Sequence, residues 1–328
     1  RPFPRLRPPG QRQRAVLWRQ RERAARHRPP LFSDGTLWLL GGFLLMNLLV
    51  LLEVADRLSL KRDLEVAREI QQAMLPDGTW SGPGVEAFGL TKPANTVGGD
   101  FYDILPQPDG TVLVALGDVA GKASPAALLM ALLLAILRTL VDEGLPLPVL
   151  VKRLNLQVAR HAPASRFITL FLASYTPSTG RLEFVNAGQT PPLLRRQDGA
   201  IERLMSGGIA LGMFEGSEYE AGEVRLDPGD ALLMYSDGLT EAESPDGTPF
   251  DEAGLERTLA LYAGAYQQSA AGDLGRAVFD AVERHRRDQR APKIADAAED
   301  DHHEAVDDVG RAAVGADMVH LAAGDTGY

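Results

Sequence analysis

Residues 112–141 read VLVALGDVAGKASPAALLMALLLAILRTLV, which joins an apolar run, an acidic turn and a second, longer apolar run. The first run, Val112–Leu116, predicts a strand, because a short apolar run bounded by turn residues is typical of one. The second run predicts a helix over Ser124–Val141, with Ser124 as its N-cap and a proline in its first turn. Asp118 lies between them, where a buried strand reaches the surface.

Strands and helices are also predicted on both sides of this stretch. The further strands are Val85–Leu90, Phe101–Leu105, Phe167–Tyr175, Leu182–Asn186 and Ala231–Tyr235. The further helices are Pro148–Arg160, Glu252–Tyr262 and Asp273–Arg286. Pro108-Asp109-Gly110 predicts a hairpin turn before the strand Val112–Leu116. Apolar strands interrupted by helix pairs indicate an α/β (α+β) domain over residues 77–287, with antiparallel sheets covered by helices.

The chain before this domain divides into three parts. Residues 1–35 are rich in Arg and Pro and predict a disordered arm. Residues 36–55 include seventeen successive positions without a charge and predict a transmembrane helix. Residues 56–76 predict a short coiled-coil linker, through which a signal or a homodimer contact can pass. Its heptad positions are Leu60, Leu64, Ala67, Gln71 and Met74.

Composition narrows the chemistry of the chain. The absence of cysteine excludes a disulfide framework, a thiolate metal site and a cysteine nucleophile. The net charge of −10 is uneven: ten arginines and one glutamate give the first thirty residues +9, so the remainder sums to about −19. The basic arm has the charge to contact anionic lipid or nucleic acid, but its place before an apolar run favours a solvated tail beside a membrane. We therefore expect no nucleic-acid partner.

Three Asp-Gly neighbourhoods carry the candidate chemistry, and they centre on Asp100, Asp118 and Asp237. Each places a carboxylate at a strand end beside glycines that let the backbone approach a ligand. One such motif alone is usually a turn. Three in one domain predict a metal site, because converging carboxylates repel one another unless a cation lies between them. Mg²⁺ and Mn²⁺ prefer such oxygen ligands.

The order of these motifs resembles the PPM family of metal-dependent protein phosphatases, in its SpoIIE/RsbU-like branch, over about residues 62–286. The matching segments are Ala67–Gln71, Leu75-Pro76, Val97–Asp103, Gly117–Lys122, Thr169–Phe171, Asn186–Gly188, Pro191-Pro192, Gly208–Gly212, Leu226–Asp230 and Tyr235–Ala242. The resemblance implies a four-layer αββα sandwich, in which two antiparallel sheets are flanked by helices, preceded by the hydrophobic helix and the linker.

The resemblance also implies a site for two Mn²⁺ or Mg²⁺ ions between the sheets. In such enzymes the Asp118 position bridges the ions, the Val119 carbonyl adds a ligand and the Asp237 position binds the second ion. The Asp100 position acts through water. The supporting loop glycines are Gly98, Gly99, Gly121 and Gly238. Water activated by the ions would hydrolyse a phosphoserine or phosphothreonine.

The implied substrate is a phosphorylated anti-sigma-factor antagonist of the STAS type in bacterial signalling. A cytoplasmic substrate predicts an inner-membrane anchor with the catalytic domain in the cytoplasm. The ten arginines before the apolar segment predict the opposite orientation, because positive charge favours the cytoplasmic side. We give more weight to the catalytic motifs, which rest on more residues.

The family's closing motif, Asp-Asp-x-Thr followed by an apolar strand, is expected near Asp288 and is absent there. The later acidic positions lack Thr and a following Val, Ile or Leu run; they are Asp300-Asp301, Asp307-Asp308 and Asp317. We therefore expect residues 288–328 to be an atypical acidic tail, as a frameshift would produce, without the fourth ligand and the core strand. The alternative function is a catalytically impaired pseudophosphatase that acts as a regulatory binding module.

Two other kinds of site, a phosphate-binding P-loop and a histidine metal site, fit the sequence less well than the aspartate site. Gly117–Lys122 lacks the spacing of a phosphate-binding P-loop, since three residues separate its glycines and Ala123 follows the lysine. His302-His303 stands among acids, and this composition favours a solvated tail over a metal site.

Overall fold

The computed structural model describes residues 16–22, 34–93, 96–121, 123–163, 165–265, 271–287 and 316–323. The chain separates into two compact units, Arg1–Arg62 and Asp63–Tyr328. In the first unit, residues 16–22 are helical within the arm of residues 1–35 that we expect to be disordered, and residues 34 and 35 belong to the next helix; residues 1–15 and 23–33 lie outside the described residues.

Helix α2 (Asp34–Met74) joins the expected membrane segment and the expected linker into one continuous helix. It ends just before Pro76, which cannot continue a helix. Within α2, the part from Gly35 onward is long and apolar enough to cross a membrane, and none of its apolar window is buried. Helix α3 (Ser124–Val141) passes the same test but is one-third buried and packs in the core.

Two antiparallel sheets form the centre of the second unit. The first has the order β1 (Thr79–Gly82), β2 (Val85–Lys92), β12 (Ala316–Ala323), β11 (Ala231–Tyr235), β7 (Leu193–Arg195) and β8 (Ile201–Arg203). The second has the order β10 (Gly222–Arg225), β6 (Arg181–Ala187), β5 (Ile168–Thr176), β4 (Val112–Val119) and β3 (Phe101–Pro106), with the short β9 (Gly207–Gly208) parallel to β6.

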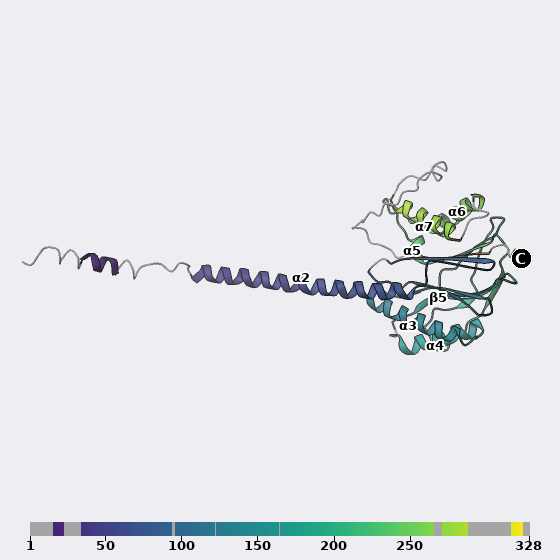
Figure 1. Ribbon diagram of the computed structural model, residues 1–328, viewed down its shortest axis with the longest axis horizontal. Helices are drawn as coiled ribbons and strands as arrows, with labels where there is room; N and C mark the ends of the chain where they lie inside the picture. Colours follow the sequence, from purple (N-terminus) through teal and green to yellow (C-terminus); the bar gives the residue numbers. More distant parts are fainter. Residues whose placement is uncertain are drawn as a thin grey trace, which may run out of the picture. The chain divides into compact units, whose positions relative to one another are not determined.

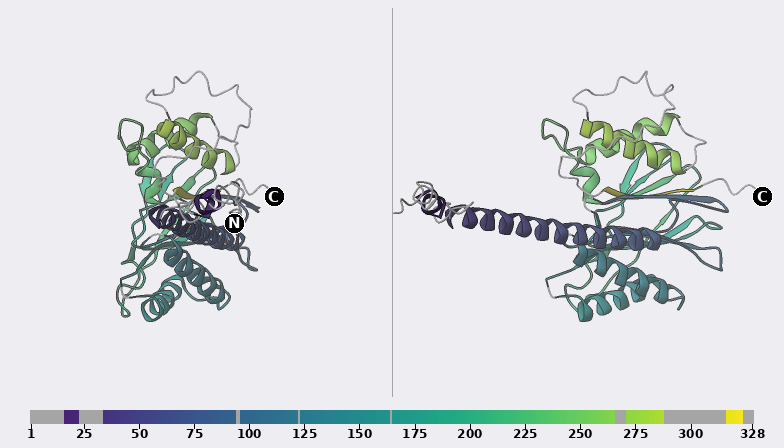
Figure 2. Two further views of the ribbon diagram at one scale, coloured as in Figure 1. Left: turned by 90° about the vertical axis from the view of Figure 1, so that its left-hand side faces the viewer. Right: turned by 60° about the vertical axis from the view of Figure 1, so that its left-hand side comes forward.

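Helices cover both outer faces of the sheet pair. Helices α3 and α4 (Leu147–His161) lie on one side, and α6 (Asp251–Ala265) and α7 (Ala271–Arg287) lie on the other (Figure 1). The same layers are visible from two further directions (Figure 2). The short α5 (Asp237–Thr240) follows β11. The predicted four-layer αββα sandwich is confirmed.

Three apolar clusters separate the four layers. One lies between α3, α4 and their sheet, one between the sheets, and one beneath α6 and α7. Along β4, Leu113 and Ala115 face the helices, whereas Val114 and Leu116 face the opposite sheet. Because successive strand residues point to opposite faces, position 118 falls on the side of the opposite sheet.

Two local predictions differ from the structure. Strand β4 continues three residues beyond Leu116 and pairs Asp118 with Thr169 of β5, so Asp118 is the penultimate residue of a strand and not part of a free turn. Ser124 is not the N-cap of α3. It is already helical, and the cap is Ala123, whose φ of 62° is unusual for a residue with a Cβ and which makes no side-chain cap hydrogen bond.

Strand β12 overturns the expectation that the core strand is missing after Asp288. It lies between β2 and β11 and pairs with both. Met318, Val319 and Leu321 are fully buried. This strand is difficult to recognise in the sequence because alanines and a buried histidine, His320, interrupt its apolar residues. Residues 316–323 therefore belong to the sandwich.

The position of β12 predicts a large stability difference between two leucine variants. Leu321→Ala should lower the free energy of unfolding by about 2–5 kcal/mol, because it opens a cavity between the sheets. Leu128→Ala, on an exposed position of α3, should change it by less than about 0.5 kcal/mol. Urea unfolding followed by circular dichroism measures both. Equal midpoints for Leu321→Ala and the wild type would contradict the placement of β12 in the core.

Candidate functional site

Two of the predicted aspartates meet at the end of one sheet. Strands β3 and β4 are antiparallel and pair Phe101 with Gly117, so Asp100 and Asp118 follow at the same end. Both positions lie on the face toward the opposite sheet, as the alternation of their strands requires. Gly99 allows this approach, because a Cβ there would stand 2.8 Å from the Val119 carbonyl oxygen.

The third aspartate comes from the opposite sheet. Strand β11 ends at Tyr235, Ser236 is extended, and Asp237 begins α5. Burial raises the pKa of Asp237, and the negative charges of Glu241 and Asp118 raise it further. The two sheets thus bring Asp118 and Asp237 close enough to repel each other. The predicted Gly238 follows Asp237 in α5 and is buried.

This repulsion tests whether the site fits a cation. The raised pKa of Asp237 means that its charged form is disfavoured in the metal-free site, and a divalent cation bound beside it would favour that form. Among the side chains that the structure describes, no group of three or more His, Asp or Glu residues has metal-binding spacing. Asp118 and Asp237 therefore form a partial oxygen-ligand set that fits Mg²⁺ or Mn²⁺ and needs a further ligand.

Strand β12 carries a further acidic residue to this end of the sandwich. Met318 pairs with Tyr235, so position 317 lies one step farther, where Asp237 also leaves the sheet. Its neighbour in β2 is Thr91. Position 317 shares the strand face of Val319 and Leu321, which is the face between the sheets. We rejected Asp317 on sequence because no Thr or apolar run follows it, and only the register shows its position.

The end of α2 is fastened to the loop that carries Asp100. The Gln71 Nε2 donates to the Gly98 carbonyl oxygen over 2.7 Å, and the Gly98 N–H donates to Gln71 Oε1 over 3.1 Å. The Tyr102 hydroxyl donates to the Pro76 carbonyl oxygen over 3.1 Å. Gln71 is buried, although the heptad pattern assigns it to a seam between helices. The predicted glycine loop is thus bound directly to the linker helix.

Asp103, the second acid of the Val97–Asp103 motif, is structural. It is almost fully buried and accepts hydrogen bonds from Arg138 of α3, from Nε over 2.8 Å and from Nη2 over 3.2 Å. Arg138 Nη2 also donates to the Met74 carbonyl oxygen over 2.7 Å. One guanidinium therefore ties α3, β3 and the end of α2 together.

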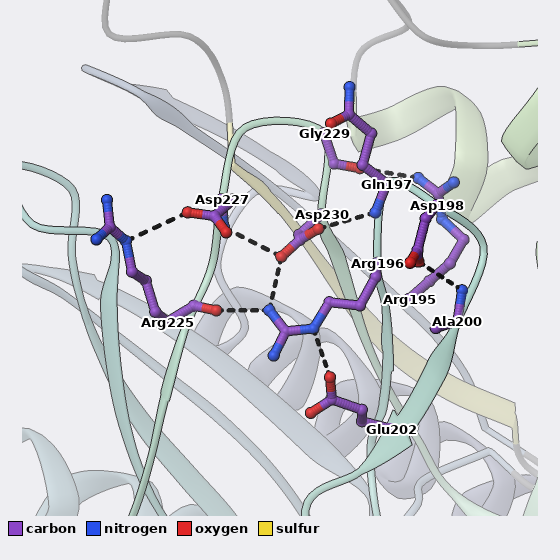
Figure 3. Close-up of polar contacts among 10 residues, drawn as sticks. All are labelled: Arg195, Arg196, Gln197, Asp198, Ala200, Glu202, Arg225, Asp227, Gly229 and Asp230. Carbon is purple, nitrogen blue, oxygen red and sulfur yellow. Dashed lines mark hydrogen bonds and ion pairs between the residues drawn. The ribbon is translucent and has the colours of Figure 1, made fainter.

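A second buried aspartate, Asp230, fixes the strand that delivers Asp237. Its carboxylate accepts hydrogen bonds from Arg196 Nη1 over 2.8 Å, from the Gln197 N–H over 2.9 Å and from the Asp227 N–H over 3.0 Å (Figure 3). Asp230 directly precedes β11. The conspicuous Leu226–Asp230 motif therefore acts as a support for the site and does not enter it.

The predicted loop glycine Gly121 has a different neighbour from the one expected. Its φ is 119°, and a Cβ there would lie 1.3 Å from Nη1 of Arg166. The same nitrogen donates to the Ala120 carbonyl oxygen over 2.6 Å. Gly121 thus makes room for a guanidinium that holds the loop after Asp118.

Two polar residues beside Asp118 were missed as site residues on sequence. Thr169 lies opposite Asp118 in the β4–β5 ladder, and its Oγ1 contacts the side chain of Gln189. Thr169 stands in the sequence within a predicted strand and the matching segment Thr169–Phe171, without a role of its own, and Gln189 stands only as a loop residue after Gly188. Neither carries a charge that would draw attention in a sequence.

The raised pKa of Asp237 predicts that this carboxylate destabilises the metal-free protein. A carboxyl group with a raised pKa in the folded state lowers stability as pH rises from its ordinary pKa through the raised value, and the loss persists at pH 7. Asp237→Asn should therefore raise the melting temperature of chelator-treated protein at pH 7 and reduce the further rise that Mn²⁺ produces in the wild type.

Thermal unfolding with EDTA and with Mn²⁺ measures both effects. Asp198→Asn, a change at an exposed turn on the β7–β8 hairpin, is the matched control and should leave the Mn²⁺ response intact. A lower melting temperature for metal-free Asp237→Asn would contradict the proposed repulsion.

Comparison with known sequences identifies relatives of the whole domain. The profile of the family "Stage II sporulation protein E (SpoIIE)" matches residues 108–296. Protein IcfG of Synechocystis sp. is 29% identical over 238 residues, which cover 64% of this chain and 37% of its own length. Phosphoserine phosphatase RsbU of Bacillus subtilis is 29% identical over 189 residues, which cover 57% of this chain and 56% of its own. The chain thus spans about half or less of these relatives' length.

Solved structures share the fold. The SiaA-PP2C domain of Pseudomonas aeruginosa has a TM-score of 0.64 at 20% identity, covering 83% of this chain and 99% of its own. The RsbU and RsbW domains of Rv1364c from Mycobacterium tuberculosis have a TM-score of 0.58 at 21% identity, covering 74% of this chain and 60% of their own. The family profile spans 189 of the 328 residues. The chain therefore belongs to the SpoIIE family, and its fold is that of the SiaA-PP2C domain.

Proposed function

We propose that the domain is a metal-dependent protein serine/threonine phosphatase that hydrolyses a phosphoserine or phosphothreonine on a bacterial regulatory protein. The observation that carries the proposal is the convergence of Asp118 and Asp237 from opposite sheets, with the pKa of Asp237 raised by burial and by neighbouring charge. Such a pair is unfavourable without a cation and suited to one. Membership of the SpoIIE family supports the same chemistry.

In this proposal the ligands are Asp118, the Val119 carbonyl, Asp237 and Asp317, with Asp100 acting through water. Asp317 supplies the fourth carboxylate that the sequence lacks near Asp288, and its place at the start of β12 supports this role. The cofactors are two Mn²⁺ or Mg²⁺ ions. Carboxylate and carbonyl oxygens match the preference of both ions.

When bound, the ions supply Lewis-acid activation of water and neutralise charge at the phosphoryl group. The chain's own residues supply the geometry. Asp118 and Asp237 hold the ions between the sheet ends, and Gly99 brings Asp100 against the Val119 backbone. The Gln71 contacts to Gly98 and the Asp230 network hold the two delivering segments in place. No nucleophilic side chain is required.

The substrate proposed is a phosphorylated anti-sigma-factor antagonist of the STAS type. Similarity to phosphoserine phosphatase RsbU supports phosphoserine or phosphothreonine chemistry, and the RsbU domain of the Mycobacterium protein occurs beside an RsbW domain. A protein substrate is also consistent with the exposed apolar side chains of Met213 and Phe214, which lie in the loop after Leu211, the bridge partner of Ile168.

Helix α2 is the proposed anchor. The apolar side chains in its first half are exposed, as in a helix that meets lipid or another helix. We propose that residues 36–55 anchor the chain in the inner membrane with the domain in the cytoplasm, and that the heptad positions of residues 56–76 support a homodimer. Residues 1–35 would be a solvated arm.

The alternative of a non-catalytic module loses its main support. It rested on a missing ligand and a missing core strand at the C-terminus. Strand β12 occupies the core, and its register with β11 supports the proposal that Asp317 is a ligand. Catalysis is therefore the function that the geometry favours.

Asp118→Asn should reduce phosphate release from a phosphoserine protein substrate by roughly 100-fold or more, because it removes a carboxylate that would hold the proposed ions. The assay uses the full chain in detergent with Mn²⁺, and EDTA should abolish activity. Asp109→Asn, in the exposed β3–β4 hairpin, is the matched control and should retain activity. Phosphate release that does not require a metal ion would contradict the proposal.

Asp317→Asn should raise the Mn²⁺ concentration needed for half-maximal activity by roughly 10- to 100-fold. Asp307→Asn tests another of the late acidic positions and should leave this concentration unchanged. Metal titrations of both variants at saturating substrate measure the effect. If Asp307→Asn alone shifts the titration, the fourth carboxylate is not Asp317.

A further inference from the structure

The backbone of Gln189 is fixed at the end of β6. Gly188, with φ of 76°, turns the chain where a Cβ would stand 2.9 Å from the Ala210 nitrogen, so only glycine fits. The Asn186 side chain then closes the turn: its Nδ2 donates to the Gln189 carbonyl oxygen over 3.0 Å, and its Oδ1 accepts from the Gln189 N–H over 2.8 Å. Gln189 therefore starts from a rigid position.

Its side chain is also held. The Thr169 hydroxyl lies 2.6 Å from Gln189 Oε1 and 3.3 Å from the Asp118 carbonyl oxygen. A hydroxyl has one proton to donate, and the shorter contact takes it. Thr169 is the ladder partner of Asp118. The carboxamide of Gln189 is thus placed beside the strand end that carries the proposed metal ligand.

The nitrogen of the Gln189 carboxamide has no hydrogen-bond acceptor among the described residues. Gln189 is only 8% exposed, and its Nε2 is buried without a hydrogen-bond partner among the described residues. Buried amide nitrogens are nearly always paired, because desolvation without a partner is costly. Since Oε1 is occupied by Thr169, Nε2 points away from it as a free donor. An acceptor brought by a ligand would satisfy this donor.

The surroundings select the kind of acceptor. The charged groups of the candidate site are the carboxylates Asp118 and Asp237, which suit cations, and a phosphoryl oxygen is the acceptor that accompanies such cations in a phosphatase. We propose that Gln189 donates a hydrogen bond through Nε2 to the phosphoryl group of the substrate, and that Thr169 is its positioning residue. The inference rests on the proposed phosphatase function and adds a neutral donor to a site otherwise made of acidic ligands.

Gln189→Met tests the donor, because methionine has a similar length and cannot donate. It should lower kcat/KM by roughly 10- to 100-fold and raise the inhibition constant of inorganic phosphate by a similar factor, as expected for a hydrogen bond to a charged group. The Mn²⁺ concentration for half-maximal activity should not change, since Gln189 is not a ligand. Gln197→Met makes the same substitution at an exposed glutamine and should change none of these values.

Thr169 tests the positioning. Thr169→Val removes the hydroxyl that orients the carboxamide and should raise the phosphate inhibition constant, whereas Thr169→Ser keeps a hydroxyl and should restore it. Gln189→Glu keeps the shape but replaces the donor with a charge that repels phosphate, so it should be the weakest phosphate binder. A purely structural role would instead lower the melting temperature of Gln189→Met and leave phosphate inhibition unchanged, and that result overturns the inference.

A direct binding measurement separates this inference from the proposed function. Calorimetry with the full chain, saturating Mn²⁺ and inorganic phosphate should show weaker binding for Gln189→Met than for the wild type and Gln197→Met. If the wild type binds phosphate in this way but never turns over phosphoprotein, the phosphatase proposal fails and the donor role of Gln189 stands. Equal binding by wild type and Gln189→Met, including no binding by either, overturns the donor role even if turnover is normal.

Discussion

The pairing of β12 between β2 and β11 is the constraint on which the candidate site depends. Without a strand there, β11 would have no neighbour on one side, and the segment that carries Asp237 would lack a fixed direction. With it, the sheet is continuous from β1 to β8, and its inner face packs Val319 and Leu321 against the other sheet. Sheet packing then decides how closely the strand ends approach.

The approach of the strand ends brings the negative charge of Asp118 near Asp237. Asp118 leaves one sheet and Asp237 leaves the other, and burial together with the charges of Glu241 and Asp118 disfavours the ionised form of Asp237. Such a cost is retained only where something offsets it. Apolar packing between the layers supplies the stability, and a bound cation would remove the repulsion. At Asp118 and Asp237, the requirements of stability and of the proposed metal binding are thus opposed.

The supports of the site are mostly buried polar groups with complete sets of partners. Asp103 is neutralised by Arg138, and Asp230 by Arg196 and two backbone N–H groups. These acids look in the sequence like Asp100 and Asp118, but their hydrogen bonds are already used within the fold. Gln189 is the opposite case, since its Nε2 is buried and unpaired among the described residues. Unused hydrogen-bonding capacity therefore separates Gln189 from these supports.

The sequence by itself determined the layers of the fold. The apolar runs of β4, α3 and β11 are uninterrupted, so their periodicity and turn residues were sufficient to predict antiparallel sheets covered by helices and the strand-end aspartates. The four-layer arrangement followed from the resemblance to a known family. Only the tertiary structure decided the role of β12, because alanines and His320 weaken its pattern and its burial comes from neighbours far away in the chain. The same holds for Thr169 and Gln189, whose contact joins strand β5 to the turn after β6, two segments that no local pattern connects. Local propensity is encoded in short windows, whereas register, burial and an unpaired donor exist only after distant strands have met.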